Sequence, residues 1–257
     1  MITIDTLTQS AIKLLKNLIE TPSFSSEEDP TALLLERWFQ RFEIPYNRYQ
    51  NNVWATNKSF DTAKPTLLLN SHHDTVKPNS GYTKNPFDAH IEDGKLYGLG
   101  SNDAGGCLVS LLATFTYFYD RDSLAYNLVF VGSAEEESSG PNGLNSMLSI
   151  VPKIDVAIVG EPTQMHLAVA EKGLVVFDVE VSGTPSHAAH PNDNNALYNA
   201  IPVMEWIKNY QFEQESEALG RVKMTLTQIN AGQQHNAVPA KVVMVVDVRV
   251  NDSYSNA

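Results

Sequence analysis

The sequence has 257 residues, of which 42% are hydrophobic and 19% charged. This composition is that of a globular chain and excludes a disordered or fibrous one. At roughly 150 residues per domain, the length predicts one large or two modest domains. The 18 basic and 30 acidic residues give a formal net charge of −12, a field that repels phosphate backbones, so we expect no nucleic-acid partner.

Two further features concern the compartment. A single cysteine, Cys107, excludes an intrachain disulfide and fits a reducing environment. Residues 1–5 form no signal peptide, and no apolar run approaches the length of a membrane span. We therefore expect a cytoplasmic protein without a membrane partner.

The first part of the chain alternates helical and strand patterns. Helical spacing covers 8–20 and 32–42, the second helix with Asp29 as its N-cap and Pro30 at its first position. A long polar loop over 77–100 contains a hairpin signal at Asp93-Gly94. A third helix is expected over 104–119, and strands over 53–56, 66–70, 127–132, 156–160 and 167–170. Such alternation predicts an α/β sheet with helices on its faces.

The pattern changes at Gly173. A strand over 174–181, a helix over 194–210 and strands over 222–229 and 242–250 predict a smaller βαββ unit of the α+β type. We place the boundary at Lys172-Gly173, which gives an α/β domain at 1–172 and a second domain at 173–257.

Acidic residues follow several of the apolar strands. The strand at 66–70 runs into His72-His73-Asp74, the strand at 127–132 into Glu135-Glu136-Glu137, and the strand at 156–160 into Glu161. Asp103 directly precedes the third helix. Ligand sites of open α/β sheets form beyond the carboxyl ends of strands, so these side chains are expected to converge. Imidazole and carboxylates gathered in this way are typical ligands of zinc or a similar divalent ion.

Taken in order, these motifs resemble a known family. The segments His72-His73-Asp74-Thr75-Val76, 98–106, Ser133-Ala-Glu-Glu-Glu137 and Gly160-Glu-Pro-Thr163 resemble the successive motifs of the co-catalytic zinc aminoacylase and carboxypeptidase family. That family includes acetylornithine deacetylase and succinyl-diaminopimelate desuccinylase, and the likeness is strongest to acetylornithine deacetylase. The resemblance implies a zinc-peptidase-like catalytic domain and a dimerisation or lid domain.

The resemblance also implies roles for individual residues. His72, Asp103 and Glu161 would bind a first divalent metal, with Asp103 shared by a second metal that Glu137 also binds. Asp74 would orient His72, and Glu136 would be the general base toward a metal-activated water. A slip of one residue within Glu135-Glu136-Glu137 remains open. Zinc is expected, while cobalt and manganese fit the same ligand types.

The second domain would contribute residues of a different kind. His187, in Gly183-Thr-Pro-Ser-His187, resembles a histidine that reaches across a homodimer and stabilises an oxyanion. Asn236 and Arg249 resemble residues that bind the substrate carboxylate, and a guanidinium suits this task. The alternative for Arg249 is a salt bridge within the sheet.

One expected element is missing from the sequence. Family members supply a histidine to the second metal from a segment downstream of the small domain, and the sequence ends at Ala257. We therefore expect an N-terminal fragment in which both domains lack their last part, and in which the second metal is bound weakly.

The leading hypothesis is a metal-dependent amidohydrolase that deacylates an N-acyl amino acid such as N-acetylornithine, a step of arginine biosynthesis. The alternatives are a dipeptidase, tripeptidase or carboxypeptidase on the same scaffold, and an inactive fragment that lacks the last histidine ligand. The acyl group cannot be chosen from the sequence.

Overall fold

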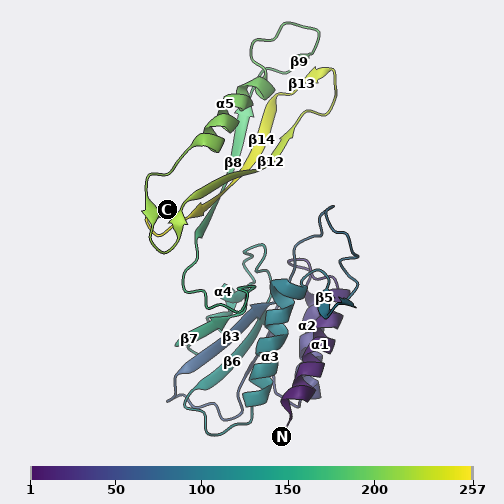
Figure 1. The fold of residues 1–257 in the computed structure, drawn as a ribbon, viewed down its shortest axis with the longest axis vertical. Helices are drawn as coiled ribbons and strands as arrows, with labels where there is room; N and C mark the ends of the chain where they lie inside the picture. Colours follow the sequence, from purple (N-terminus) through teal and green to yellow (C-terminus); the bar gives the residue numbers. More distant parts are fainter. Residues whose placement is uncertain (1, 256–257) are drawn as a thin grey trace. The chain divides into compact units, whose positions relative to one another are not determined.

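The computed structural model describes residues 2–255 (Figure 1). The chain folds into two compact units, Met1–Met165 and His166–Ala257. The division falls shortly before Lys172-Gly173, where the sequence pattern changes, and residues 166–172 form no helix or strand.

The first unit is a mixed α/β structure, as the sequence pattern predicted. Its elements in chain order are α1 (Ile4–Glu20), α2 (Asp29–Arg41), β1 (Asn47–Tyr49), β2 (Asn52–Thr56), β3 (Thr66–His72), β4 (His90–Glu92), β5 (Lys95–Tyr97), the wide helical turn η1 (Ser101–Gly105), α3 (Gly106–Phe118), β6 (Asn127–Ser133), α4 (Leu144–Met147) and β7 (Val156–Val159). Strands β4 and β5 form the hairpin that was expected around Asp93-Gly94.

The central sheet has the strand order β1-β2-β6-β3-β7. Strand β3 runs parallel to both β6 and β7, while β2 pairs with β6 and β1 pairs with β2 in antiparallel fashion. The register places His72 opposite Ser133 and Asn70 opposite Val159. The three parallel strands therefore end at the same edge, and the residues that follow them enter one region.

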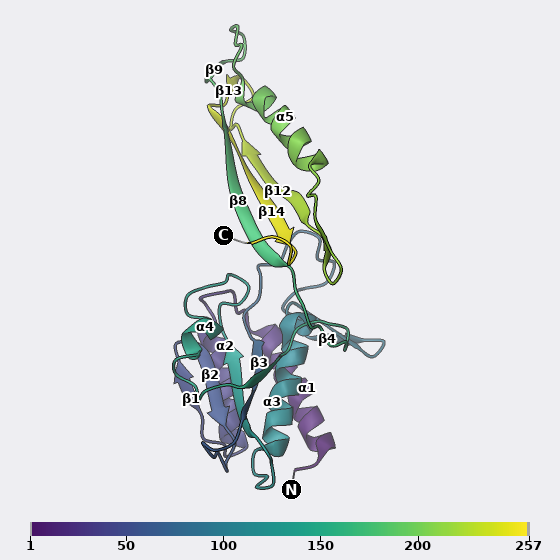
Figure 2. The ribbon, with the colours of Figure 1, turned by 90° about the vertical axis from the view of Figure 1, so that its left-hand side faces the viewer.

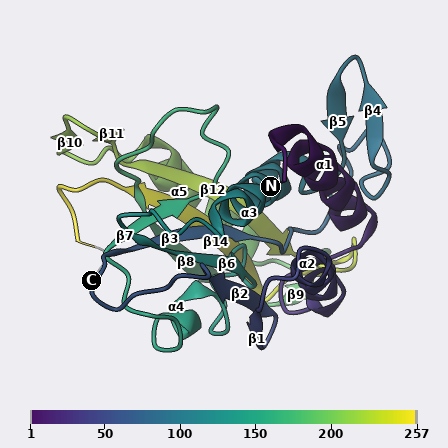
Figure 3. The same cartoon turned by 90° about the horizontal axis from the view of Figure 1, so that it is seen from below.

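Two hydrophobic layers cover the sheet. The main core joins α1, α2 and α3 to one face and includes the fully buried Leu35, Phe39, Leu112, Phe115 and Phe130. On the opposite face, α4 and the chain after it pack through Met147 and Val151 against Leu68, Val129 and Val131. Figure 3 shows α1 and α3 on one side of the strands and α4 on the other. Both faces of β6 are thus buried, which explains its continuous apolar sequence.

The start of α2 differs from the prediction. We expected Asp29 to be the N-cap, but the cap position is occupied by Glu28, and the helix begins at Asp29. The Glu28 side chain makes no capping hydrogen bond. Its carboxylate is buried and accepts hydrogen bonds from other segments, described below, and it is therefore not available to the first turn of the helix.

The second unit has the βαββ order that the sequence predicted. Strands β12, β14 and β8 form an antiparallel sheet, and α5 packs on one face of it through Ala196, Ala200 and Ile207 (Figure 2). Asn195 caps α5 by accepting a hydrogen bond from the Leu197 N–H. The elements are β8 (Gly173–Ser182), β9 (Ser186–His187), α5 (Ala196–Asn209), β10 (Glu215–Ser216), β11 (Gly220–Arg221), β12 (Lys223–Ala231), β13 (Ala237–Val238) and β14 (Lys241–Val250).

One predicted strand is wrong. Residues 167–170 form no strand, and Leu167 and Val169 are 88% and 87% exposed. The apolar alternation of this segment finds neither a pairing strand nor a buried face, so it cannot form a ladder. Within the described part of the chain, no helix is both long enough and apolar enough to cross a membrane.

Candidate metal centre

The centre is built around His72, the last residue of β3. Its side chain is only 1% exposed. Nδ1 lies 3.0 Å from the main-chain carbonyl oxygen of Asp74 and 3.4 Å from Oδ1 of the same residue. The carbonyl can only accept, so Nδ1 carries the proton and donates it there. The other ring nitrogen, Nε2, is left facing a group of carboxylates.

Three carboxylates surround Nε2 of His72. Oδ1 of Asp103 lies at 3.2 Å, Oε1 of Glu161 at 3.7 Å and Oε2 of Glu136 at 3.9 Å. These acids are 55%, 36% and 54% exposed, respectively, so the histidine forms the buried floor of a site whose acids reach solvent. The strand ends and the turn before α3 thus bring their side chains together, as expected.

The backbone around Asp103 and Glu161 places both side chains. Gly100 precedes η1 with φ +74°, a conformation that favours glycine, and a Cβ there would lie 2.7 Å from Cγ2 of Thr75. Gly160 follows β7, and a Cβ there would lie 2.8 Å from a methyl group of Leu111. These close approaches let the turns that carry Asp103 and Glu161 pack tightly beside the sheet edge.

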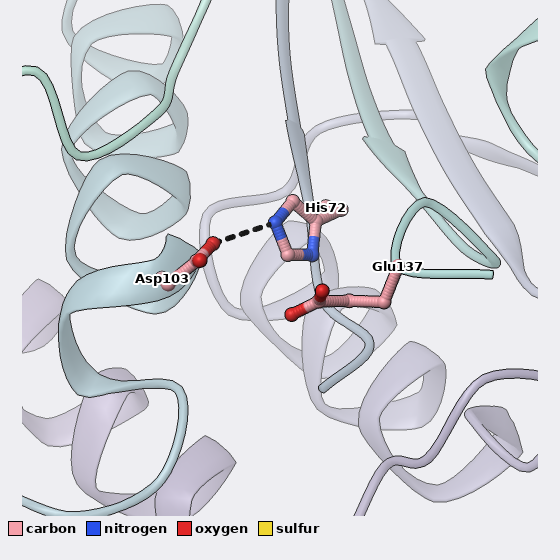
Figure 4. A group of neighbouring side chains, drawn as sticks. All are labelled: His72, Asp103 and Glu137. Atoms are coloured by element: carbon pink, nitrogen blue, oxygen red, sulfur yellow. Dashed lines mark hydrogen bonds and ion pairs between the residues drawn. The ribbon is translucent and has the colours of Figure 1, made fainter. Parts of the chain in front are cut away.

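Two groups of three residues could each hold a metal ion. Within each group, one ligand atom per residue lies within 4.8 Å of the others: the first group is His72, Asp103 and Glu137, and the second is His72, Glu136 and Glu161. Figure 4 shows the first group, with Asp103 and Glu137 directed toward the imidazole from different elements. In the described part of the chain, His72 is the histidine of both groups.

The glutamate triplet divides into two kinds of residue. Glu135 has φ +53° and a buried side chain that accepts hydrogen bonds from the main-chain and side-chain N–H groups of Asn142. It belongs to neither group, whereas Glu136 and Glu137 each belong to one. Within the triplet, only the second and third residues reach His72.

Burial and the neighbouring charged side chains shift the pKa values of several residues of the centre. Burial lowers the pKa of His72, but the hydrogen bond and charge of Asp74 and the charges of Glu161 and Glu136 outweigh burial and raise it to about 9. Burial and the neighbouring carboxylates raise the pKa of Glu161 to about 7, and burial also raises the pKa of Glu137. Burial opposes the ionised form of Asp74, yet hydrogen bonds from His72, Ser25 and the Glu136 N–H lower its pKa.

The donor set fits a divalent cation. Several carboxylates held together repel one another unless a cation neutralises them, and burial together with this repulsion raises the pKa of Glu161 to about 7. Nδ1 of His72 is fixed by an acceptor, which is the arrangement that orients Nε2 as a metal ligand. One imidazole nitrogen and several carboxylate oxygens suit zinc, cobalt or manganese.

The loop after β6 is held by side chains that the sequence did not single out. The consecutive N–H groups of residues 134–137 each donate to a side chain: Ala134 to Oδ1 of Asn52 at 3.0 Å, Glu135 to Oε1 of Glu28 at 3.1 Å, and Glu136 and Glu137 to the two oxygens of Asp74 at 3.1 and 3.2 Å. Ser25 also donates to Asp74, at 2.7 Å. No sequence motif marks Ser25, Glu28 or Asn52.

The candidate residues of the second unit occupy two places within it. His187 lies in β9, which pairs with β13, and Asn236 precedes β13 and accepts the Ala188 N–H through its carbonyl. Arg249 lies near the far end of β14, eight residues from Lys241, or about 27 Å at ~3.4 Å per residue. Its guanidinium donates to both oxygens of Asp247, at 3.0 and 3.2 Å.

Comparisons with known proteins match this arrangement. The sequence profile of peptidase family M20/M25/M40 matches residues 68–242, which include every strand end of the centre. The chain belongs to peptidase family M20/M25/M40. It is therefore a member of a family of hydrolases, as the motifs predicted.

The relatives and solved structures agree with the family. Succinyl-diaminopimelate desuccinylase of Rickettsia typhi is 27% identical over 262 residues, which cover 94% of this chain and 68% of that protein. A family M20 metallo-carboxypeptidase of Sulfolobus solfataricus has a TM-score of 0.70 at 18% identity, over 98% of this chain and 72% of that one. A dinuclear metal-binding peptidase of the family from Bacillus subtilis has a TM-score of 0.64 at 16% identity, over 98% and 67%. The chain thus spans about two thirds of the length of these proteins.

Proposed function

We propose that the protein is a metal-dependent amidohydrolase that cleaves the amide bond of an N-acyl amino acid. The observation that carries this proposal is the meeting of His72 with Asp103, Glu136, Glu137 and Glu161 at the carboxyl edge of three parallel strands. Two divalent ions, zinc in the first instance, would be held by His72, Asp103 and Glu161 and by Asp103 and Glu137. Bound ions of this kind polarise an amide carbonyl and favour the ionisation of water.

Glu136 is the proposed general base. It removes a proton from the attacking water as the water oxygen bonds to the carbonyl carbon, and it returns that proton to the amine nitrogen as the C–N bond breaks. Its partly exposed carboxylate at the rim of the centre, 3.9 Å from Nε2 of His72, suits a group that must meet both water and substrate. Asp74, fully buried behind His72, orients the imidazole.

The second unit supplies the remaining proposed roles. His187 would stabilise the oxyanion, from the partner subunit of a homodimer, and Asn236 and Arg249 would bind the substrate carboxylate. The pairing of Arg249 with Asp247 means that the guanidinium must exchange one carboxylate partner for another when substrate binds. Asn236 precedes β13, before the start of β14, whereas Arg249 lies near the end of β14. The proposal therefore takes the two residues that bind one substrate from different subunits.

The substrate is best sought among two acylated amino acids. The motifs favour N-acetylornithine, and the relatives named succinyl-diaminopimelate desuccinylase favour an N-succinyl amino acid. The second candidate activity is that of a peptidase, because solved structures with the same fold include a carboxypeptidase and a tripeptidase.

The test measures hydrolysis of N-acetylornithine, N-succinyl-diaminopimelate and a dipeptide panel by the metal-loaded protein, expressed from its complete reading frame. We expect release of the free amine from an N-acyl amino acid. Glu136→Gln should lower kcat by about 10²–10⁴-fold while still binding metal. The matched change Glu27→Gln, on an exposed side chain, should leave kcat unchanged. Cleavage of dipeptides without cleavage of any N-acyl amino acid would replace the first proposal by the second.

A further inference from the structure

We propose that Glu28 is a positioning residue for the two glutamates of the centre, acting through the backbone of Glu135. The expected effect on metal affinity rests on the proposed function. The role of Glu28 in holding the backbone of Glu135 does not depend on that function. Glu28 lies just before α2 and is 107 residues away from Glu135 in the sequence.

The Glu28 carboxylate is completely buried and accepts only from N–H groups. Oε1 accepts the Ser26 N–H at 2.6 Å and the Glu135 N–H at 3.1 Å, and Oε2 accepts from the Asn51 side-chain amide at 2.8 Å. A buried carboxylate without such partners is strongly destabilising, so these bonds determine its position. Asn51 is itself fixed, because its side-chain oxygen accepts from Arg48 and its carbonyl accepts from Nε2 of His73.

The bond to Glu135 acts at the point where the loop changes direction. Glu135 has φ +53°, which is unfavourable for a residue with a side chain and persists only where its surroundings impose it. Glu28 binds the N–H of this residue, and Asp74 binds the next two N–H groups. The directions of the Glu136 and Glu137 side chains toward His72 follow from these three bonds.

Glu28 and Asp74 therefore divide the task. Asp74 contacts both the imidazole and the loop, whereas Glu28 contacts neither His72 nor a candidate ligand in any hydrogen bond or ion pair among the described residues. A change at Glu28 tests the loop without changing the donor atoms of the centre.

The test compares Glu28→Ala and Glu28→Gln with the control Glu27→Ala, which changes the exposed neighbour in the same loop. On the metal-free protein, hydrogen exchange of the Glu135, Glu136 and Glu137 amides should accelerate at least tenfold in Glu28→Ala, while amides of α3 keep their rates. Glu28→Gln retains an acceptor oxygen and should restore part of the protection. Titration with Zn²⁺ alone should show a loss of affinity of about 10–100-fold in Glu28→Ala, and none in Glu27→Ala.

The outcomes separate this inference from the proposed function. Unchanged exchange at residues 135–137 in a folded Glu28→Ala protein would overturn the inference, as would unchanged Zn²⁺ affinity. If the wild type binds no Zn²⁺ while the exchange result holds, the proposed function fails and the positioning role stands. If Glu28→Ala does not fold, Asn51→Ala removes one hydrogen bond to the same carboxylate. Accelerated exchange of the Glu135 amide in Asn51→Ala would then support the inference, and unchanged exchange would overturn it.

Discussion

Oδ1 of Asp74 lies 3.4 Å from Nδ1 of His72, and the main-chain carbonyl of Asp74 lies closer still, at 3.0 Å from the same nitrogen. The Asp74 carboxylate also accepts the N–H groups of Glu136 and Glu137. A single buried side chain thus contacts the imidazole and fixes the loop of the two glutamates. The orientation of a histidine and the placement of two carboxylates depend on the same residue.

Asp74→Asn tests this double dependence. The amide keeps one acceptor oxygen but presents N–H donors where the Glu136 or Glu137 N–H donates, so one loop bond is lost. We expect a 10–100-fold loss of Zn²⁺ affinity and a lower pKa of His72, because Asp74 no longer contributes a charge. Calorimetry and an NMR titration of the imidazole measure the two effects.

Asp93→Asn is the matched control for this change. Asp93 is exposed in the β4–β5 turn and has φ +50°, which asparagine also adopts. A similar loss of affinity in both variants would show that the effect of Asp74→Asn is not specific to the centre.

Metal binding should release protons. In the metal-free protein the pKa of His72 is about 9 and that of Glu161 about 7, and a metal binds only the deprotonated ligands. Protons therefore compete with the metal, and the apparent Zn²⁺ affinity should rise as the pH increases from 6 to 9. At pH 7 we expect roughly 1.5 protons to be released when the ion held by His72 and Glu161 binds, about one from His72 and about half of one from Glu161.

Calorimetry in buffers of different ionisation enthalpy counts these protons. Glu161→Gln should release about half a proton fewer at pH 7, since the glutamine has no proton to lose. An affinity independent of pH over this range would contradict the arrangement of ligands described here.

His73 should make the metal-free protein less stable in acid. Its ring is buried between the Thr31 hydroxyl and the Asn51 carbonyl, and burial lowers its pKa below the ordinary value of 6.5. The unfolded chain therefore binds this proton more readily, so His73 contributes stability above pH 6.5 that is lost as the pH falls toward its folded-state pKa.

Urea unfolding at several pH values between 5 and 8 measures this contribution. Subtracting the unfolding free energy of His73→Gln from that of the wild type cancels the contributions of the other titrating groups. The remaining difference should vary with pH below 6.5. A difference that is constant across the range would mean that His73 does not carry the effect.

Phe39 anchors the main core of the first unit. Its ring is fully buried and lies about edge-on to Phe115 and Phe130, with centroids 6.2 and 6.0 Å away. Phe39→Ala should lower the free energy of unfolding by about 3–5 kcal/mol. Leu33→Ala, on the same helix but 40% exposed, should change it by less than about 0.5 kcal/mol. Urea unfolding of both variants provides the comparison.

The convergence of the centre could be predicted because it depends on local patterns. Each apolar run, such as Leu67–Leu69, ends where a polar residue begins, and parallel pairing then brings those ends to one edge. Strand type and direction follow from periodicity and from helical connections, so the convergence of the segments after β3, β6 and β7 could be predicted from the residues. The choice of His72, Glu136 and Glu137 within their segments rested on the resemblance to the family.

Glu28 shows what local patterns do not contain. Glu27 and Glu28 are the same residue type in the same loop, yet the first is exposed and the second completely buried. The buried carboxylate of Glu28 has three N–H partners, and one of them, the N–H of Glu135, lies more than a hundred residues away in sequence. The error at Leu167–Ala170 has the converse cause, since a strand-like pattern there has no neighbouring strand to pair with. The roles of His187, Asn236 and Arg249 remain predictions.

The four bonds to residues 134–137 also have a consequence for folding. Their acceptors lie at positions 28, 52 and 74, separated from their donors by 62 to 107 residues. Contacts over such distances form only after long loops have closed, so they arise late in folding. A chain with its helices formed but its sheet incomplete would hold the acids of the centre apart. Tight metal binding would then require that these distant segments have already come together.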